Sequence, residues 1–269
     1  MIKIIKNIEN YLDYIATINK SNNFFDPVLR NNDDYIKMGR KDKNIVLGSF
    51  DENEMIRGIF SFLVIEDDKY AELLLASSKN IEAYEELFSY IDVNYHDYDV
   101  YFVYNPLNNI LNDMLAKRNA KFWPIQMKMI CDNYNIGKKI FDVVALNDEI
   151  LNQYFDIHNN DIYWNAKRVI ADKSFKSFVA ISNGKAIGYI DIRMEHLENH
   201  IMDVIVLEEY RNKGYGAKLI NKALKDSYPK SMLLEVDNDN YPARHLYEKT
   251  GFRYLPRENI ITVLLRNNN

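Results

Sequence analysis

The stretch HIMDVIVLEEYRNKGYGAKLINKAL occupies residues 200–224 and predicts three elements in succession. An apolar strand is expected over 201–207, where Asp203 carries the only charge. The basic turn RNKGYG follows at residues 211–216. An amphipathic helix comes next, because apolar residues recur at helical spacing on one face and lysines occupy the other.

The glycine turn has the properties of an anion site. Backbone N–H groups at a helix N-terminus carry partial positive charge, and glycine has no side chain to block an approaching phosphate. Arg211 and Lys213 add positive charge at the rim. These features suit a pyrophosphate. The same residues also fit a basic turn that caps an ordinary helix, and the rest of the chain has to distinguish the two.

The composition is that of a globular protein with one large or two medium domains. The 269 residues are 47% hydrophobic and 27% charged, which allows a substantial core. No apolar run is long enough for a signal peptide or a membrane span. The single cysteine, Cys131, excludes an intrachain disulfide framework and is compatible with a reducing environment. A cytoplasmic protein without a membrane partner is therefore expected.

The net charge of −5 does not indicate a nucleic-acid partner. Residues 1–135 hold 15 Lys and Arg against 21 Asp and Glu, a balance of −6, and residues 136–269 hold 19 against 18, a balance of +1. The acidic half either presents a solvated acidic surface or attracts a cationic substrate or partner.

The same order of elements is expected twice: strand, one or two helices, three strands joined by hairpins, helix, strand, helix, strand. The first half is expected to supply strands at 2–5, 44–50, 55–65, 70–76, 99–104 and 122–130. The second half is expected to supply strands at 141–145, 177–181, 186–194, 200–207, 232–236, 252–255 and 260–265. The polar segment 132–139 is the predicted boundary. Such repetition predicts a tandem pair of related α/β domains.

Gly58 and Gly188 fall at corresponding points of the third expected strand of each half. A glycine within a strand indicates a bulge or a close approach of another backbone. The two positions are therefore expected to be equivalent in the repeat.

A second informative segment, residues 234–252, reads LEVDNDNYPARHLYEKTGF. Asn240 is expected to cap a short helix, and Pro242 is tolerated in the first turn of that helix. Gly251 is expected to end the helix in the left-handed conformation. Ala243 would let the helix lie close to a neighbouring chain or cofactor.

Together the two segments resemble the signatures of the GNAT N-acetyltransferase family. The turn matches the pattern Arg-x-x-Gly-x-Gly at Arg211, Gly214 and Gly216. The second segment matches the pattern Asn-x-x-Ala-x-x-Leu-Tyr-x-x-x-Gly-Phe at Asn240, Ala243, Leu246, Tyr247, Gly251 and Phe252. The resemblance implies two tandem GNAT-like domains of the α/β class, each a mostly antiparallel mixed sheet flanked by helices. It covers the second half closely and the first half only through the order of elements.

The first half departs from the family pattern. Residues 77–80, SSKN, stand where the turn would be, with neither an arginine nor a glycine pair. Ala116 or Lys117 stands where the tyrosine would be. A cradle without glycine or an N–H-rich turn binds a pyrophosphate poorly. Residues 1–135 are therefore expected to be a degenerate, non-catalytic domain that shapes the substrate cleft or an interface, and residues 136–269 the catalytic domain.

For the second half the resemblance implies a site for acetyl-CoA, the acyl donor, and no metal ion. The turn would hold the pyrophosphate, and the preceding strand would align the pantetheine arm through main-chain hydrogen bonds. The cofactor-binding residues expected on this basis are Ile205, Val206, Leu207, Arg211, Asn212, Lys213, Gly214, Tyr215, Gly216, Ala217, Asn240 and Tyr247.

The resemblance also implies direct transfer of the acetyl group to a neutral amine. Tyr247 is the expected general acid at sulfur, since a phenol with a pKa of about 10 is protonated at neutral pH, whereas a core tyrosine bonded to a carbonyl is the alternative. Asp203 is the expected general base, unless it pairs with a buried partner or faces solvent. Glu195, His196 and Glu198 are weaker candidates for the base.

Other residues have weaker functional interpretations. Tyr163 and Trp164 either border the acceptor site, as the resemblance implies, or are aromatic anchors of the core. Asp191 alternates with apolar neighbours and is expected on a solvated strand face. His158 and His245 show no metal-ligand spacing.

The expected function is acetyl-CoA-dependent N-acetylation of a primary amine on a small molecule or a peptide. Two alternatives stay open: a protein acetyltransferase acting on an N-terminus or a lysine, and an acyl-CoA sensor without turnover. A homodimer formed through the first half is a further possibility. No feature of the sequence names the acceptor.

Overall fold

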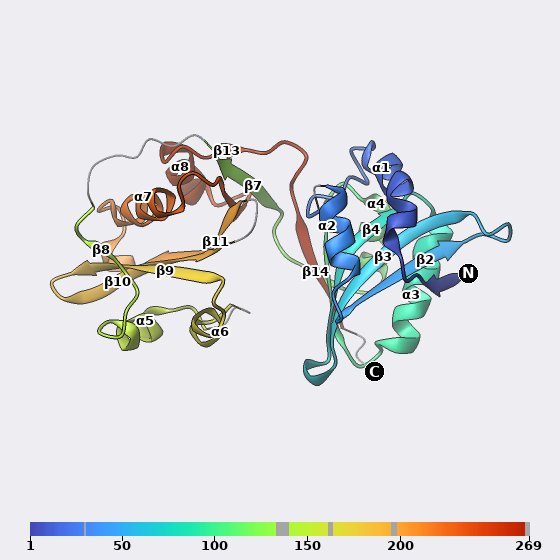
Figure 1. Ribbon diagram of the computed structural model, residues 1–269, viewed down its shortest axis with the longest axis horizontal. Helices are drawn as coiled ribbons and strands as arrows, with labels where there is room; N and C mark the ends of the chain where they lie inside the picture. The colour runs from blue at the N-terminus through green and yellow to red at the C-terminus, as the bar shows by residue number, and fades with distance from the viewer. Residues whose placement is uncertain (30, 133–139, 161–163, 195–197, 267–269) are drawn as a thin grey trace. The chain divides into compact units, whose positions relative to one another are not determined.

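The chain folds into two compact units, Met1–Gln126 with Pro256–Asn269 and Met127–Leu255. The structure, a computed structural model, describes residues 1–29, 31–132, 140–160, 164–194 and 198–266. Each unit is built on one seven-stranded mixed sheet with helices packed on it (Figure 1). The expected fold class is therefore confirmed.

The sheet of the first unit has the strand order β1-β2-β3-β4-β5-β14-β6. Neighbouring strands are antiparallel except β4 and β5, which are parallel. The strands are β1 (Ile2–Ile4), β2 (Asn44–Phe50), β3 (Ile56–Ile65), β4 (Tyr70–Ser78), β5 (Asp99–Tyr104), β6 (Lys121–Phe122) and β14 (Ile261–Arg266). The helices are α1 (Leu12–Asn19), α2 (Asn32–Gly39), α3 (Ile81–Asn94) and α4 (Asn109–Lys117), with short 3-10 turns η1 (Ile8–Tyr11) and η2 (Glu66–Asp68).

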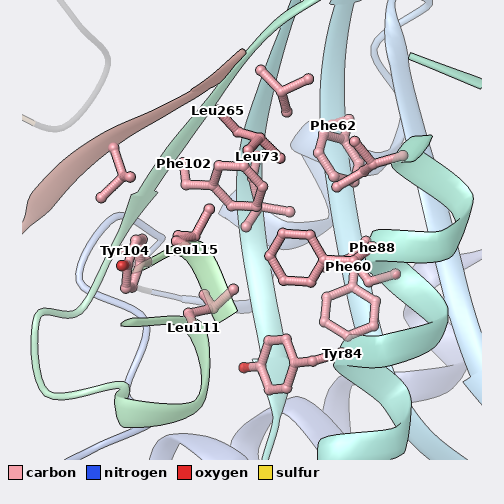
Figure 2. Close-up of a cluster of buried hydrophobic side chains, with 14 of the residues drawn as sticks. Phe60, Phe62, Leu73, Tyr84, Phe88, Phe102, Tyr104, Leu111, Leu115 and Leu265 are labelled. Carbon is pink, nitrogen blue, oxygen red and sulfur yellow. The ribbon is translucent and has the colours of Figure 1, made fainter. Parts of the chain in front are cut away.

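The core of this unit follows from period-two alternation along its strands. In β5, Val100, Phe102 and Tyr104 are buried and the residues between them are partly exposed. The ring of Phe102 stacks on Phe88 of α3 with a centroid separation of 5.7 Å. Figure 2 shows these rings together with Leu265 of β14, so a residue near the end of the chain completes this core.

The sheet of the second unit has the strand order β13-β7-β12-β11-β10-β9-β8, and β11 and β12 are parallel. The strands are β7 (Gln126–Cys131), β8 (Val143–Ala145), β9 (Phe175–Ser182), β10 (Lys185–Arg193), β11 (Asn199–Val206), β12 (Met232–Asp237) and β13 (Arg253–Tyr254). The helices are α5 (Leu151–Ile157), α6 (Ala166–Ala171), α7 (Tyr215–Ser227) and α8 (Tyr241–Lys249), with the 3-10 turn η3 (Glu208–Tyr210). Helices α7 and α8 cover one face of the sheet, and α5 and α6 the other (Figure 1).

The last strand of each half is exchanged between the two sheets. Strand β14 pairs antiparallel with β5 along its whole length, from Ile261 opposite Tyr104 to Arg266 opposite Asp99. Strand β7 lies in the second sheet, between β13 and β12. In Figure 1 the red strand β14 accordingly belongs to the first unit, and the green strand β7 belongs to the second.

This exchange corrects the division at 135/136, which assigned residues 122–130 to the first sheet and 260–265 to the second. Both segments are apolar and strand-forming, so their local pattern does not specify the sheet that they join. Non-local packing specifies it: Val263 and Leu265 are 0% and 1% exposed in the core of the first unit. Most of the predicted boundary segment, residues 133–139, lies outside the described residues.

The two units share a strand irregularity at equivalent points. The register of β3 with β4 shifts immediately after Ser61 pairs with Leu75, and that of β10 with β11 shifts after Asp191 pairs with Asp203. Each shift leaves one residue of the partner strand unpaired, as in a β-bulge. These pairs therefore align the two units position by position.

Gly58 and Gly188 lie at the same distance before this shift, opposite Ser78 and Val206, so their expected equivalence is confirmed. A Cβ atom on Gly188 would lie 2.5 Å from the carbonyl oxygen of Ile205. Only glycine allows β11 to approach so closely at this point.

The strand exchange predicts that a substitution near the end of the chain destabilises the first unit. Leu265→Ala removes a buried side chain of its core and should lower the free energy of unfolding of that unit by about 2–5 kcal/mol. Native-state hydrogen exchange should then accelerate in β2–β5 and stay unchanged in β9–β11.

Leu224→Ala is the matched control, because Leu224 of α7 is 2% exposed in the core of the second unit. It should accelerate exchange in β9–β11 instead. Faster exchange of β9–β11 in Leu265→Ala would contradict the exchange of strands.

Candidate functional site

The parallel pairing of β11 with β12 covers only three residue pairs, from Asn199 opposite Met232 to Ile201 opposite Leu234. The bulge in β11 follows immediately. Over 203–206, among the described residues, β11 is paired along one edge only, with β10. On the other edge the carbonyl of Val206 accepts a hydrogen bond from Arg211 Nε at 3.0 Å. The remaining main-chain groups of this edge can bind a ligand through hydrogen bonds.

The turn after β11 ends in a helix N-terminus without a side-chain cap. Gly214, the N-cap of α7, has φ 84°, and Asn212 in the same turn has φ 60°. Lys218 donates the first intrahelical hydrogen bond, to the carbonyl of Gly214. The N–H groups of the first turn of α7 thus have no side-chain acceptor and are oriented toward an incoming anion. In α2, α3, α4, α6 and α8, by contrast, an asparagine accepts such an N–H.

A groove of about 680 Å³ opens at this helix N-terminus, between the free edge of β11 and helix α8. Its lining includes every predicted cofactor-binding residue except Leu207 and Lys213. These lining residues are Ile205, Val206, Arg211, Asn212, Gly214, Tyr215, Gly216, Ala217, Asn240 and Tyr247. The sequence prediction therefore selected residues that come together in space.

Leu207 and Lys213 lie at the margins of the turn. The N–H of Leu207 donates to the carbonyl of Ile187. The Lys213 ammonium donates to the carbonyl of Glu209 and lies 5.3 Å from the ring centroid of Tyr210. Both interactions hold these residues outside the lining of the groove.

Helix α8 forms the opposite wall of the groove. Its cap is as expected, because the Asn240 side chain accepts the N–H of Ala243 at 3.2 Å. Gly251 ends it with φ 98°, also as expected. A Cβ atom on Gly216 would lie 2.9 Å from the side chain of Leu246, so glycine lets α7 pack closely on α8.

Tyr247 and Asp203, the two predicted catalytic residues, interact electrostatically, but only Tyr247 lines the groove. Tyr247 is 7% exposed at the floor of the groove. Burial, with a contribution from the charge of Asp203, raises the pKa of Tyr247 to about 12. The phenol is therefore protonated at neutral pH and can act as a proton donor.

Asp203 is partly buried and accepts a hydrogen bond from the Tyr189 hydroxyl at 2.5 Å. Burial raises the pKa of its carboxyl group above the ordinary value, and the charge of Asp191 adds to this effect. The Tyr189 hydrogen bond and the positive charge of His158 act in the opposite direction. A carboxylate with a raised pKa is a stronger base than an exposed one.

A buried polar cluster lies beside Asp203, on the sheet face that carries α5. Asp191 is 1% exposed and accepts hydrogen bonds from Ser177 Oγ at 2.5 Å, Tyr154 OH at 2.9 Å and His158 Nε2 at 2.9 Å. The other ring nitrogen of His158 lies 2.8 Å from the carbonyl oxygen of Asn159. A carbonyl and a carboxylate are both acceptors, so both ring nitrogens carry protons and the imidazole is cationic.

The pKa of His158 agrees with this assignment. Burial lowers it, but the hydrogen bond and the charge of Asp191 outweigh burial, and the pKa is raised above the ordinary value.

The expectation that Asp191 lies on a solvated face was wrong, because α5 covers that face. The cluster was not predicted from the sequence. The polar residues Ser177, Tyr189 and Asp191 on two neighbouring strands were the feature that could have indicated it.

The remaining candidates are less informative. Trp164 packs on Phe175 with a centroid separation of 4.8 Å, and the Arg193 guanidinium lies 5.3 Å from the Trp164 ring. Glu198 is partly buried just before β11. The other candidates, Tyr163, Glu195 and His196, lie outside the described residues.

The equivalent region of the first unit is closed. Only Lys79 separates the end of β4 from Asn80, and the side chain of Asn80 caps α3 by accepting the N–H of Ala83 at 2.9 Å. The space between the ends of β4 and β5 is about 10 Å³, and residues 24–27 line it. The Asn105 amide holds this segment by donating to the carbonyl of Phe25 at 3.2 Å.

Among the residues that the structure describes, no helix is long and apolar enough to cross a membrane. No group of three or more His, Cys, Asp or Glu side chains is arranged to hold a metal ion in the same residues.

Comparison with known proteins agrees with this geometry. Residues 143–252 match the model of the Acetyltransferase (GNAT) family. This part of the chain is a GNAT domain. It contains the whole groove, from the free edge of β11 to the end of α8.

Two curated relatives resemble part of the chain. An N-alpha-acetyltransferase of Saccharolobus solfataricus is 37% identical over 92 residues, which cover 28% of this chain and 55% of that protein. A spermidine N(1)-acetyltransferase of Vibrio cholerae is 28% identical over 109 residues, covering 39% of this chain and 60% of that protein. The chain thus spans only a little over half the length of these relatives.

Solved structures extend the similarity to the whole chain, at the level of fold. A GCN5-related N-acetyltransferase from Sphaerobacter thermophilus has a TM-score of 0.71 at 9% identity, covering 100% of this chain and 96% of that one. A tandem GNAT protein from the clavulanic acid biosynthesis pathway has a TM-score of 0.58 at 10% identity, covering 100% and 99%. Both units therefore have GNAT-like folds, in the predicted tandem arrangement.

The buried ion pair predicts a pH-dependent stability of the second unit. His158→Leu leaves Asp191 without its cationic partner and should lower the free energy of unfolding by about 3–5 kcal/mol. Because the folded-state pKa of His158 is raised, its stabilisation is complete below its unfolded pKa of about 6.5 and is lost as pH rises through the folded pKa. The difference between native chain and variant should therefore shrink at alkaline pH.

Urea unfolding followed by Trp164 fluorescence, in a Trp123→Phe background, reports the second unit alone. His245→Leu is the control, because His245 is exposed on α8. A stability difference for His158→Leu that grows with rising pH would contradict the assignment of a cationic His158.

Proposed function

We propose that the second unit transfers an acetyl group from acetyl-CoA to a primary amine. The observation that carries the proposal is one groove in which the uncapped N-terminus of α7, the outer edge of β11 and the buried Tyr247 meet. The charge of Asp203, a partly buried residue of β11 outside this lining, acts on Tyr247. The family match of residues 143–252 supports the same reaction class.

The residues present fit an acyl-CoA pyrophosphate. The first-turn N–H groups of α7 would bind its oxygens, and Arg211 would add positive charge at the rim. Gly214 leaves room for the anion, since nothing lies within 4 Å of where a Cβ atom would stand. The free edge of β11 would bind the amides of the pantetheine arm as a neighbouring strand would.

The two catalytic residues, Asp203 and Tyr247, would transfer protons during the reaction. Asp203 takes a proton from the bound ammonium, so that the neutral amine can attack the thioester carbonyl. The carbon–nitrogen bond forms and the carbon–sulfur bond breaks. Tyr247 donates its proton to the departing thiolate and regains one from the second proton that the attacking nitrogen loses as the amide forms. The proton held by Asp203 is released to solvent.

The acceptor is a primary amine of a peptide or a small molecule. The two relatives, an N-alpha-acetyltransferase and a spermidine N(1)-acetyltransferase, represent both kinds of amine. We infer a cytoplasmic protein, because its only cysteine cannot form an intrachain disulfide and acetyl-CoA is an intracellular donor.

The first unit would not bind acetyl-CoA. Its α3 N-terminus is already capped by Asn80, and Phe24 and Phe25 line the small space between β4 and β5. The position of Asp203 is occupied by Leu75, which has no proton to exchange. These features support the proposed non-catalytic role of this unit.

Gly214→Asp should abolish stabilisation by acetyl-CoA. An aspartate adds a negative charge where the pyrophosphate would bind and disfavours the positive φ. In the native chain, acetyl-CoA at about 100 times its dissociation constant should stabilise the folded second unit by about 2.7 kcal/mol, measured as a rise in Tm.

The matched control is Gly184→Asp, because Gly184 also has positive φ and open space around it but lies in the β9–β10 turn. It should lose some stability and keep the full response to acetyl-CoA. A response retained in Gly214→Asp, or no response in the native chain, would contradict the proposed binding site.

Asp203→Asn and Tyr247→Phe should each lower kcat roughly hundredfold or more while leaving binding of acetyl-CoA intact. Thiol release is measured with a panel containing a peptide N-terminus, a lysine peptide and spermidine. Tight binding of acetyl-CoA without turnover of any amine by the native chain would favour the alternative, an acyl-CoA sensor.

A further inference from the structure

Tyr189 of β10 lies behind the groove rather than in its lining, and it is 0% exposed. Its hydroxyl oxygen accepts the backbone N–H of Asn159 at 3.1 Å. Its single proton is donated to Asp203 Oδ2 at 2.5 Å. Since the acceptor side of the hydroxyl is occupied by an N–H donor, the proton is directed toward the carboxylate.

The Tyr189 ring is held in place by the buried ion pair. His158 stacks on it with a centroid separation of 4.5 Å and an interplanar angle of 13°. The orientation of His158 is in turn fixed at both ring nitrogens, by Asp191 and by the carbonyl of Asn159. The edge of Tyr154 packs against the same ring, at 5.4 Å. Tyr189 is thus fixed from two sides.

The first unit shows that the fold itself does not require this cluster. The strand registers, aligned on the shared bulge, place Val46, Ile59, Ser61 and Leu75 where the second unit has Ser177, Tyr189, Asp191 and Asp203. Three of these four residues are apolar, and they pack in one hydrophobic cluster. A buried ion pair is also weak evidence for a stabilising role, because desolvation offsets its attraction. The cluster therefore occurs in the unit that has the open groove, and the fold shared by the two units does not require it.

We propose that Tyr189 is a positioning residue for Asp203, with His158 and Asp191 as its support. Its hydrogen bond fixes one carboxylate oxygen, Oδ2, and favours the ionised form against the burial of the group. The inference rests on the proposed function, in which Asp203 must be ionised before it can accept a proton from the amine.

The groups that act on the charge of Asp203 include Tyr189 and Asp191 from β10, His158 from the end of α5 and the backbone N–H of Val204. Asp203 in turn raises the pKa of Tyr247 of α8. Asp191 disfavours ionisation, whereas Tyr189 and His158 favour it. Removing the Tyr189 hydroxyl should therefore shift the titration of Asp203 to higher pH.

The test compares Tyr189→Phe with the native chain, because phenylalanine keeps the ring stack and deletes only the hydroxyl. The control is Tyr84→Phe, since Tyr84 is an equally buried tyrosine of the first unit whose hydroxyl donates to the carbonyl of Ser78 at 3.1 Å. Two readouts are taken: the pH profile of kcat/KM, and the carbon-13 NMR titration of the aspartate carboxyl groups, with Asp203 assigned through Asp203→Asn. Thermal unfolding with acetyl-CoA checks that each variant folds and binds.

In Tyr189→Phe the acidic limb of the kcat/KM profile and the titration of Asp203 should move together to higher pH. At the pH optimum kcat should fall roughly tenfold, while the KM for acetyl-CoA stays unchanged. Tyr84→Phe should leave both profiles as in the native chain.

An unchanged titration of Asp203, or a shifted titration with an unchanged acidic limb, would overturn the inference. Absence of turnover with every amine in the native chain would instead refute the proposed function. The carbon titration, which needs no turnover, would then still decide whether Tyr189 controls the ionisation of Asp203.

Discussion

Strands β11 and β12 separate after three parallel residue pairs, and the candidate site depends on that separation. A bulge in β11 follows the last pair and turns the strand away from its neighbour. The freed edge of β11 can then bind a ligand as a missing strand would. The groove that lies along this edge is lined by Tyr247.

The first unit has the same bulge and the same parallel pair of strands, but the space between the strand ends is only about 10 Å³. Two local differences account for this. The connection between β4 and α3 is a single residue before an asparagine cap, whereas residues 207–213 and an uncapped glycine connect β11 to α7. In addition, residues 24–27 line the space between the strand ends. One scaffold therefore exists in an open and a closed form in the same chain.

Much of the site could be predicted from sequence, because its key features are local. A glycine turn before a helix, an asparagine cap and a left-handed glycine each depend on a few neighbouring residues, and the structure contains all three. The exchange of β7 and β14 could not be predicted, since both strands have the same local pattern and only contacts distant in sequence decide their sheets. The cluster around Asp191 was missed for a similar reason: alternation separates the two faces of a strand, but it does not say that α5 covers the second face.

The central claim is that the N-terminus of α7 binds the pyrophosphate of acetyl-CoA. Amide hydrogen exchange with saturating acetyl-CoA tests it most directly. We expect strong protection of the amides of Tyr215, Gly216 and Ala217, together with 203–206, and no change at the start of α3. Protection at residues 80–83 of the first unit, or no protection at the start of α7, would contradict it.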